Sequence, residues 1–443
     1  MSHYAMFLGC TIPARFPFME KSIRMVLSEL DIHTIDLEGT TCCPTKSIAN
    51  VIGNKTWYVT GARNLALAEA AGLNILTPCN GCFSSFKAVI TDLNMDLNLR
   101  DSVNRELGRV GLEYTGKVKV KHIVQVLHDD VTAAEIKKRV VKPLTGMKVA
   151  VHYGCHMVRP SSAIHFDDPN RPSKFDVLVE AIGAQSVDYS TKMMCCGNDL
   201  NSVGESDAAI AMSREKLLET QQIADGMTTA CPACFNQYDS KQYLMQKSGE
   251  HIDMPIIYLT ELLGLSFGFS PEEMGMKMHR VDTTQFLEKW EQRTAYLEEV
   301  RNNFDLDMLD RCYQCGACMD DCPVVKVNPD FNPNRVIGDI LAGKMEEVLN
   351  GPDVWRCVSC YTCFELCPQR FGMNKVFENL KQLAYQMNIM PEGVDGGIKM
   401  LLETGRLGEP TAMRKKLKLP DLPKSGSKDL RILLKLDEES ESQ

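Results

Sequence analysis

Cysteine spacing is the strongest constraint on how this chain of 443 residues can fold. All 18 cysteines fall into four groups, and no cysteine is left over. The first group is Cys10, Cys42, Cys43, Cys79 and Cys82, and the second is Cys155, Cys195, Cys196, Cys231 and Cys234. The third is Cys312, Cys315, Cys318 and Cys322, and the fourth is Cys357, Cys360, Cys363 and Cys367. A chain of this length does not need disulfides to compensate for a small core, so the spacing must indicate their role.

The first two groups are one pattern that occurs twice. The second group follows the first by 145 residues at its first cysteine (155 − 10), by 153 at the adjacent pair (195 − 42) and by 152 at the last pair (231 − 79). An apolar run precedes the first cysteine in both copies, at residues 4–9 and 148–154. This self-similarity predicts an internal duplication.

Each copy alternates predicted strands with predicted helices. The apolar runs at 4–9, 73–78, 148–154 and 227–230 are typical of buried strands. Helical patterns occupy 17–30, 63–71, 83–93, 174–182, 207–224 and 235–245. The alternation predicts an α/β fold, with each half built around a small parallel sheet. Since the carboxyl ends of parallel strands meet at one edge, we expect the cysteines of each half to converge there.

Metal ligation explains these cysteines better than the alternatives do. Each Cys-x2-Cys pair opens a helical pattern, where unsatisfied backbone amides lower a thiol pKa and favour a thiolate ligand. Neighbouring side chains in extended structure diverge, so an adjacent pair such as Cys195 and Cys196 suits a large multi-iron centre. Zinc uses four ligands and would leave one cysteine over in each half, and disulfides are unstable in a reducing compartment. Zinc and redox thiols or disulfides remain the alternatives to clusters.

The third and fourth groups carry a more specific pattern. Both have the spacing Cys-x2-Cys-x2-Cys-x3-Cys-Pro, which is the run of bacterial two-cluster ferredoxins, with zinc as the alternative. In that run the fourth cysteine binds the other cluster. One [4Fe-4S] cluster is therefore assigned to Cys312, Cys315, Cys318 and Cys367, and the other to Cys357, Cys360, Cys363 and Cys322. A helical pattern at 334–349 predicts a mainly helical ferredoxin domain.

The predicted domains are two cysteine-rich halves at 1–145 and 146–268, a linker at 269–305, a ferredoxin domain at 306–400 and a partly disordered tail at 401–443. The linker contains an amphipathic helix capped by Asp282 or Thr283. Its apolar face consists of Phe286, Trp290, Leu297 and Val300. We expect this helix to pack the ferredoxin domain against the first domain or a partner, with a solvated spacer as the alternative.

Charge and hydropathy exclude several classes of partner. The formal charge of −9 argues against nucleic acid or anionic lipid as the main partner. No apolar run approaches the roughly 18 to 20 residues that span a bilayer, and residues 1–11 lack the features of a signal peptide. No G-x-G-x-x-G run opens a helix, so a flavin or nicotinamide must reside on another protein. These patterns predict a cytoplasmic iron–sulfur protein.

The cysteine pattern resembles the B and C components of heterodisulfide reductase joined in one chain. Two copies of Cys-x(31 to 39)-Cys-Cys-x(34 to 35)-Cys-x2-Cys precede the double ferredoxin run, and the likeness extends to about residue 400. It implies that each five-cysteine set binds a noncubane [4Fe-4S] cluster, beside the two cubane clusters of the ferredoxin domain. The first half departs from the family by reading Cys42-Cys43-Pro44, whereas the second keeps Cys195-Cys196-Gly197. The order, with the B-like part first, is the reverse of that in the membrane-linked fused form.

The resemblance also implies an activity and partners. The substrate of that family is the coenzyme M–coenzyme B disulfide of methanogenesis, cleaved between the two noncubane clusters. Electrons would come from a flavoprotein resembling the A component of the same family, itself supplied by a hydrogenase or formate dehydrogenase module, in a multi-protein complex. The alternatives are an electron-relay component of a flavin-dependent dehydrogenase and a related sulfur-metabolism complex that acts on another thiol.

Only the cysteines are predicted as site residues, and no catalytic acid or base is assigned. Arg15, Lys46, His156 and Arg159 are weaker candidates for binding a sulfonate or phosphate, because each lies near a cluster cysteine in sequence. For each of them, a surface charge or a role in balancing the thiolates is the favoured explanation. His152 ends a strand pattern and is expected to be a hydrogen-bonded core histidine and not a ligand.

Overall fold

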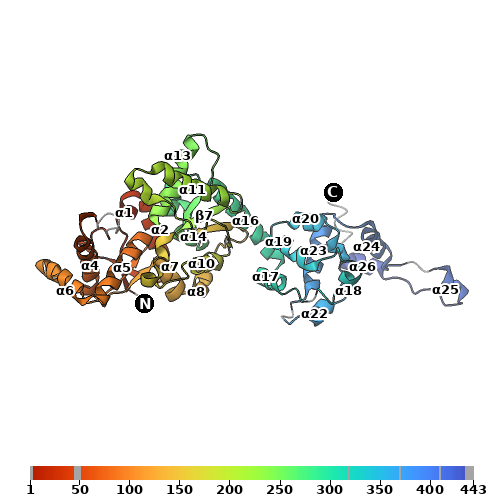
Figure 1. Cartoon of the computed structure of the whole chain (residues 1–443). Helices are drawn as coiled ribbons and strands as arrows, with labels where there is room; N and C mark the ends of the chain where they lie inside the picture. Colours follow the sequence, from red (N-terminus) through yellow and green to blue (C-terminus); the bar gives the residue numbers. More distant parts are fainter. Residues whose placement is uncertain (1–2, 44–50, 318, 369–370, 409–410, 435–443) are drawn as a thin grey trace. The chain divides into compact units, whose positions relative to one another are not determined.

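The computed structural model describes residues 3–43, 51–317, 319–368, 371–408 and 411–434. The chain forms two compact units, Met1–Ala295 and Tyr296–Gln443. Figure 1 shows the helices and strands of the chain, coloured in sequence order.

Unit 1 contains two parallel sheets with the same strand order. The first sheet has the order β2-β1-β3-β4, and the second has the order β6-β5-β7-β8. The strands of the first are β1 (His3–Met6), β2 (His33–Asp36), β3 (Asn74–Thr77) and β4 (Val120–His122). Those of the second are β5 (Lys148–His152), β6 (Gln185–Val187), β7 (Gly226–Thr229) and β8 (Ile256–Tyr258). The predicted duplication is thus present in the topology, and the predicted α/β fold is confirmed.

The central strands are apolar because helices cover both faces of each sheet. β1 pairs with β2 and β3, and its Tyr4, Ala5 and Met6 are buried. The flanking helices of the first half are α2 (Pro17–Glu29), α4 (Asn54–Ala70), α5 (Asn80–Met95) and α6 (Leu97–Leu107). Those of the second half are α10 (Lys174–Ala181), α11 (Ser206–Thr220), α13 (Lys241–Lys247) and α14 (Leu259–Ser266).

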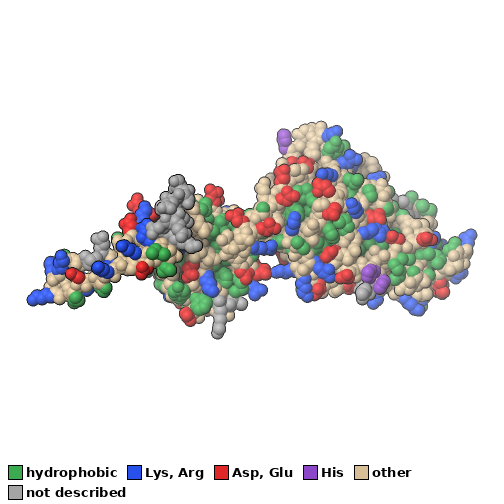
Figure 2. Space-filling view, turned by 180° about the vertical axis from the view of Figure 1, so that it is seen from behind, with side chains coloured by type: hydrophobic (Ala, Val, Ile, Leu, Met, Phe, Trp, Pro, Cys, Tyr) green, Lys and Arg blue, Asp and Glu red, His purple; other side chains and the backbone are tan. Residues whose placement is uncertain are grey.

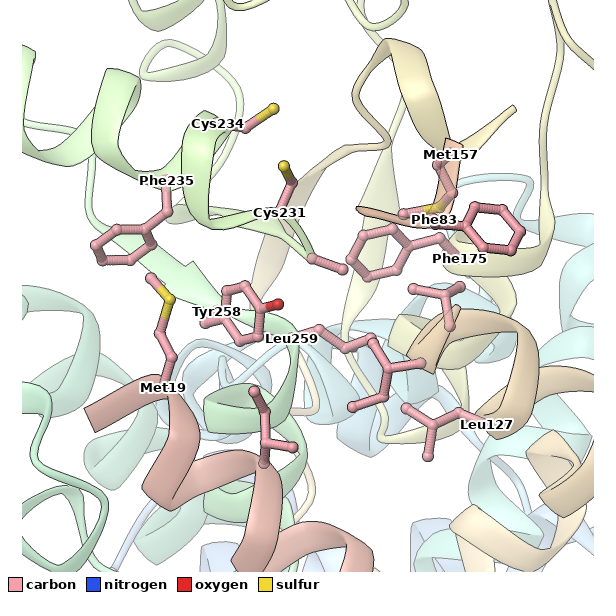
Figure 3. Packing of buried hydrophobic residues seen from close by; sticks show 14 of the residues in the cluster. Met19, Phe83, Leu127, Met157, Phe175, Cys231, Cys234, Phe235, Tyr258 and Leu259 are labelled. Atoms are coloured by element: carbon pink, nitrogen blue, oxygen red, sulfur yellow. The ribbon is translucent and has the colours of Figure 1, made fainter. Parts of the chain in front are cut away.

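The two halves share one core, because elements of each pack against the other. α14 of the second half packs on α2 of the first, where the hydroxyls of Ser22 and Thr260 are 2.7 Å apart. In the matching relation, α7 (Ile123–Gln125) of the first half packs on α10. Figure 3 shows residues from both halves, including Met19, Phe83, Phe235 and Tyr258, in one buried cluster.

Most of the predicted segments coincide with observed elements, with two differences in length. The helix expected at 63–71 begins nine residues earlier, at Asn54. The single helix expected at 334–349 is wrong in detail: it is divided into α19 (Pro333–Leu341) and α20 (Met345–Asn350). The break falls at Gly343, whose φ of 90° lies outside the helical range and favours glycine.

Unit 2 is helical, with a second buried cluster. Its main helices are α17 (Leu306–Cys315), α18 (Pro323–Val327), α19, α20, α22 (Thr362–Glu365), α23 (Met373–Gln386) and α24 (Glu392–Thr404). Ile337, Ile340, Phe377 and Leu380 lie in the buried cluster. The tail also contains α25 (Ala412–Lys416) and α26 (Ser427–Leu433), and its acidic end, 435–443, is outside the described residues.

The linker helix predicted from sequence is α16 (Thr284–Asn303). Of the two candidate caps, Asp282 accepts a hydrogen bond from the backbone amide of Thr284, at 2.9 Å. Phe286 and Trp290 are buried in the core of unit 1, so the first part of this helix is not a solvated spacer. None of the described helices is both long and apolar enough to cross a membrane. Acidic and basic side chains are interspersed over the face that Figure 2 shows.

Candidate iron–sulfur sites

The cysteines of unit 1 lie beyond the carboxyl ends of parallel strands. Cys10 follows β1, and Cys79 follows β3. β1 and β3 are neighbours at the point where the strand order reverses, which is where α/β sheets leave a crevice. Cys155 and Cys231 follow β5 and β7 at the same point of the second sheet. The expected convergence at one sheet edge therefore occurs in both halves.

The thiols of the first half form a continuous series. The Cys42 Sγ donates to the Cys10 Sγ at 3.9 Å. Cys43 contacts Cys42 on one side and Cys82 on the other, and Cys82 in turn contacts Cys79. Cys10 and Cys42 are exposed, whereas Cys43 and Cys82 are buried. The series thus extends from the surface into the core.

The second half repeats this series at equivalent positions. Cys155 contacts Cys195, which also contacts Cys196. Cys196 contacts Cys234, and Cys234 contacts Cys231. Figure 3 shows Cys231 and Cys234 close together at the start of α12 (Pro232–Phe235).

The two series meet at Cys79, which is half-buried, and Cys231, which is buried. The thiol of Cys79 is within hydrogen-bonding reach of the thiol of Cys231. The full order is Cys10, Cys42, Cys43, Cys82, Cys79, Cys231, Cys234, Cys196, Cys195 and Cys155. Each residue in one direction is the duplicate of the residue at the same place in the other direction, so the ten sulfurs have approximate twofold symmetry.

Hydrogen bonds from side chains of one half to backbone carbonyls of the other hold this junction. The Asn80 Nδ2 donates to the Tyr153 carbonyl at 2.7 Å, and the hydroxyl of Tyr258 donates to the Pro78 carbonyl. Both residues are buried. Asn80 and Tyr258 are site residues that sequence reasoning missed, because their partners are distant in sequence and no local pattern marks them.

Glycines permit the close approach of backbone and sulfur. Gly9 and Gly154 precede Cys10 and Cys155, and both have a φ of 72°. A Cβ at Gly9 would lie 2.8 Å from the Cys82 Sγ. A Cβ at Gly154 would collide with the Asn80 side chain and lie 3.3 Å from the Cys234 Sγ. Only glycine fits both the backbone conformation and the space.

Crowding perturbs the ionisation of these thiols. Hydrogen bonds from Cys42 and Cys82 lower the pKa of Cys43 to about 4. Bonds from Cys155 and Cys196 lower the pKa of Cys195 to about 2. Conversely, the thiol of Cys195 raises the pKa of Cys196 to about 12. Thiolates at this spacing repel one another, so full ionisation of either set requires a strongly cationic partner among them.

Buried polar groups near the second set also fit such a partner. The Lys216 ammonium lies 3.0 Å from the His152 Nδ1, which therefore accepts, so the ring proton is on Nε2. The His152 Nε2 and the Tyr238 hydroxyl are buried and have no hydrogen-bond partner among the described residues. Both groups interact electrostatically with cysteines of the second set. Unpartnered donors facing thiolates suit the sulfur atoms of an iron–sulfur cluster. His152 is a core histidine as expected, but only one nitrogen is hydrogen-bonded.

The four weaker candidates differ in position. Arg15 is exposed at the end of α1 (Thr11–Arg15), and His156 is exposed beside Cys155. Arg159 is half-buried, its Nε donates to the Pro169 carbonyl, and its charge acts to lower the pKa of Cys155 against larger opposing effects. Lys46 lies outside the described residues.

Two cavities of unit 2 are lined by cysteines. One is lined by Cys322, Cys357, Cys360 and Cys363, together with apolar residues such as Phe331 and Phe377. The other is lined by Cys312, Cys315 and Cys367, with Leu366 and Phe371. Cys318 lies outside the described residues. In each cavity the cysteines of one run are joined by the last cysteine of the other run.

Both parts of the chain match known families. Residues 4–87 and 149–239 match the family described as "Cysteine-rich domain", and residues 308–371 match the "4Fe-4S dicluster domain".

Three relatives are informative. The chain is 36% identical over 293 residues to the B component of the ferredoxin/F(420)H(2)-dependent CoB-CoM heterodisulfide reductase of Methanosarcina acetivorans, which covers 65% of this chain and 97% of the relative. It is 30% identical over 137 residues to a protein of Archaeoglobus profundus described as like the C component of heterodisulfide reductase, covering 30% of this chain and 73% of the relative. It is also 32% identical over 283 residues to the 8-methylmenaquinol:fumarate reductase membrane anchor subunit of Wolinella succinogenes, covering 64% of this chain and 98% of the relative.

A solved structure shares the fold. A hypothetical protein from Helicobacter pylori superposes with a TM-score of 0.50 at 14% identity, covering 63% of this chain and 52% of that one. At this identity the likeness concerns the fold alone.

Proposed function

Since the chain belongs to the family of the heterodisulfide reductase B component and continues into a ferredoxin domain like that of the C component, we propose that it reduces a disulfide at two noncubane [4Fe-4S] clusters. The disulfide is the coenzyme M–coenzyme B heterodisulfide or a related one. Two cubane [4Fe-4S] clusters in unit 2 deliver the electrons. The observation that carries this proposal is the symmetric series of ten sulfurs with Cys79 and Cys231 at its centre.

Each five-cysteine set is proposed to hold one noncubane cluster. The sets are Cys10, Cys42, Cys43, Cys79 and Cys82, and Cys155, Cys195, Cys196, Cys231 and Cys234. In unit 2, Cys312, Cys315, Cys318 and Cys367 are proposed to hold one cubane cluster, and Cys357, Cys360, Cys363 and Cys322 the other. The two cysteine-lined cavities support this division. We also propose that the domains span 1–145, 146–268 and 306–400, with a linker at 269–305.

Disulfide cleavage requires two electrons, which iron–sulfur clusters supply one at a time. It also requires iron sites that can bind a thiolate. The chain's own residues determine access to those sites. Cys10, Cys42 and Cys195 are exposed, whereas Cys43, Cys82, Cys231 and Cys234 are buried. A substrate therefore approaches the outer ends of the series, where Arg15 and His156 are exposed and can bind an anionic substituent.

The ferredoxin-like unit requires an external electron source. We propose a flavoprotein resembling the A component of the same family, supplied by a hydrogenase or formate dehydrogenase module, within a multi-protein complex. The relationship to separate B and C components supports such a complex. A cytoplasmic location is part of the proposal, because 18 cysteines intended as thiolate ligands require reducing conditions.

A second function is favoured by one relative. The Wolinella succinogenes protein is 32% identical to this chain over 283 residues but is described as belonging to 8-methylmenaquinol:fumarate reductase. On that analogy, the chain would be an electron relay to a dehydrogenase or reductase that performs the chemistry. A related sulfur-metabolism complex is a variant of the first proposal with another disulfide.

One experiment separates these functions. The full chain, purified without oxygen and reduced with a viologen dye, is mixed with the coenzyme M–coenzyme B disulfide, and dye oxidation is followed. Disulfide-dependent oxidation by the chain alone supports disulfide reduction. Oxidation that requires an added flavoprotein and another acceptor supports the relay and contradicts the proposal.

A further inference from the structure

Lys216 is a fully buried lysine in the second half, with no exposed surface. It lies on α11, and its Nζ donates to the carbonyls of Lys192 and Met194 at 3.0 Å each. Its third contact is the His152 Nδ1, also at 3.0 Å. All three donors of the ammonium are therefore used by neutral acceptors, and none of these three partners neutralises its charge.

The ionisable groups that interact electrostatically with this ammonium are cysteines of the second set. Burial lowers the pKa of Lys216 to about 8, while Cys234, Cys196, Cys155 and Cys195 act to raise it. These are four of the five cysteines of the second set. A buried cation is costly unless it faces negative charge, and the cysteines, as thiolate ligands of the proposed cluster, would provide that charge.

The first half has a neutral residue at the equivalent place. Asn64 lies on α4, and its Nδ2 donates to the carbonyl of Thr41, the residue before Cys42, at 3.3 Å. Lys216 binds the carbonyl of Met194, the residue before Cys195. The separation of 152 residues (216 − 64) matches that of the last cysteine pairs. Duplication therefore produced two helices that hold equivalent loops, one through an amide and one through an ammonium.

Among the described residues, the cations next to Asn64 and near Cys155 do not remove this asymmetry. Arg63, next to Asn64, donates to the Gly39 carbonyl in an exposed contact, where water screens its charge. Arg159 adds a cation near Cys155, so it increases the difference in favour of the second half. Moreover, Lys216 contacts His152, which lies three residues before Cys155. The residue three before Cys10 is the apolar Phe7.

We propose that Lys216 raises the reduction potential of the cluster held by the second half above that of the cluster held by the first. This inference rests on the proposed function, because it requires clusters at both sets. A low-potential one-electron donor, such as a reduced [4Fe-4S] centre, transfers one electron to the second cluster. Its net charge becomes more negative by one, and no bond forms or breaks. The buried ammonium stabilises that added charge, so the second cluster is reduced first.

The test compares charge with position. The full chain and its variants Lys216→Met and Lys216→Arg are purified without oxygen, and iron and sulfide are counted. The potential of each cluster is then measured by redox titration monitored by electron paramagnetic resonance. Cys42→Ser and Cys195→Ser identify which signal belongs to which half. The reciprocal variant, Asn64→Lys, places a cation in the first half.

We expect the Met variant to make reduction of the second cluster at least about tenfold less favourable, which is about 59 mV for one electron. The Arg variant should keep its potential near that of the unaltered chain, since the charge remains. Asn64→Lys should raise the potential of the first cluster. Potentials that are unchanged in the Met variant, or that fall equally in the Met and Arg variants, would overturn the proposal.

If the Met variant loses the second cluster, the potential of the first cluster in Asn64→Lys becomes the test. A higher potential of the first cluster then supports the proposal, and an unchanged potential contradicts it. Failure of the proposed function has a different signature, namely no cluster at the five-cysteine sets or no disulfide reduction by the unaltered chain. Loaded clusters whose potentials ignore Lys216 would instead contradict this inference alone.

Discussion

Cys79 and Cys231 bring their thiols together although they are 152 residues apart (231 − 79) and belong to different halves. Each caps the start of a helix, α5 or α12, beyond the end of the third strand of its half. The contact therefore makes the two cysteine sets neighbours at the Cys79 and Cys231 ends of the two series. Any change at this junction is expected to reach both sets.

Substitution at the junction should disturb both of the noncubane clusters proposed for the five-cysteine sets. We expect Cys79→Ser and Cys231→Ser each to alter the paramagnetic resonance signals of both five-cysteine sites, because each side chain contacts the other set. Cys10→Ser and Cys155→Ser lie at opposite ends of the series and serve as controls that alter one site each. Iron analysis follows the same samples, with about 16 irons expected in the unaltered chain. Effects of Cys79→Ser confined to the first site would contradict a shared junction.

Gly9→Ala should destabilise the fold and reduce cluster content. Its left-handed backbone costs alanine about 1 kcal/mol, and the new methyl would lie 2.8 Å from the Cys82 Sγ, which adds about 1–3 kcal/mol of overpacking. Gly72→Ala is the matched control, because Gly72 has a φ of 68° but open space around it. Anaerobic urea unfolding measures both variants. Equal losses of unfolding free energy would show that the contact with Cys82 is unimportant.

Much of this arrangement follows from local sequence, and the rest depends on distant contacts. The apolar runs before Cys10 and Cys155 indicate strands, and the repeated spacing indicates the duplication. The position of Asn80 against Tyr153 does not follow from either pattern, because the two residues belong to different halves. The burial of Lys216 could not be predicted from sequence either, because a lysine on a helix is ordinarily exposed. Only the tertiary structure shows that this one is buried.

The helices of unit 2 illustrate a smaller limit. The apolar positions at 334–349 keep a helical period through Gly343, and only the positive φ of that residue separates α19 from α20. Periodicity identifies which face is buried, whereas a single backbone angle decides whether one helix or two present that face.

Stability should depend on pH through His279. Burial acts to lower the pKa of His279, but the charge and hydrogen bond of Glu261, at 2.9 Å, together with Asp239, leave it raised. A histidine whose folded pKa is raised stabilises the fold fully below its unfolded pKa of about 6.5, and this contribution is lost as pH rises through the folded pKa. Both side chains are almost fully buried, at 1% and 0% exposure. Breaking the pair should cost about 3–5 kcal/mol.

The measurement is chemical unfolding of the full chain and of His279→Gln at pH 6 and pH 8.5. We expect the difference in unfolding free energy to be larger at pH 6, where the histidine is charged. Lys138→Gln, which removes an exposed pair with Glu135, is a control with a small effect at both pH values. A loss from His279→Gln that is greater at pH 8.5 would contradict the assigned sign.

Crossed ligation in unit 2 gives the last prediction. Cys322 lines a cavity with Cys357, Cys360 and Cys363, although it is nearer in sequence to Cys315. Cys367 lines the other cavity with Cys312 and Cys315. Cys322→Ser should therefore disturb the same resonance signal as Cys360→Ser, and Cys367→Ser the same signal as Cys315→Ser. Either loss should slow dye-independent electron delivery to unit 1 while the noncubane signals remain accessible to chemical oxidants. If Cys322→Ser instead reproduced the effect of Cys315→Ser, each run would bind its own cluster, and the crossed assignment would be wrong.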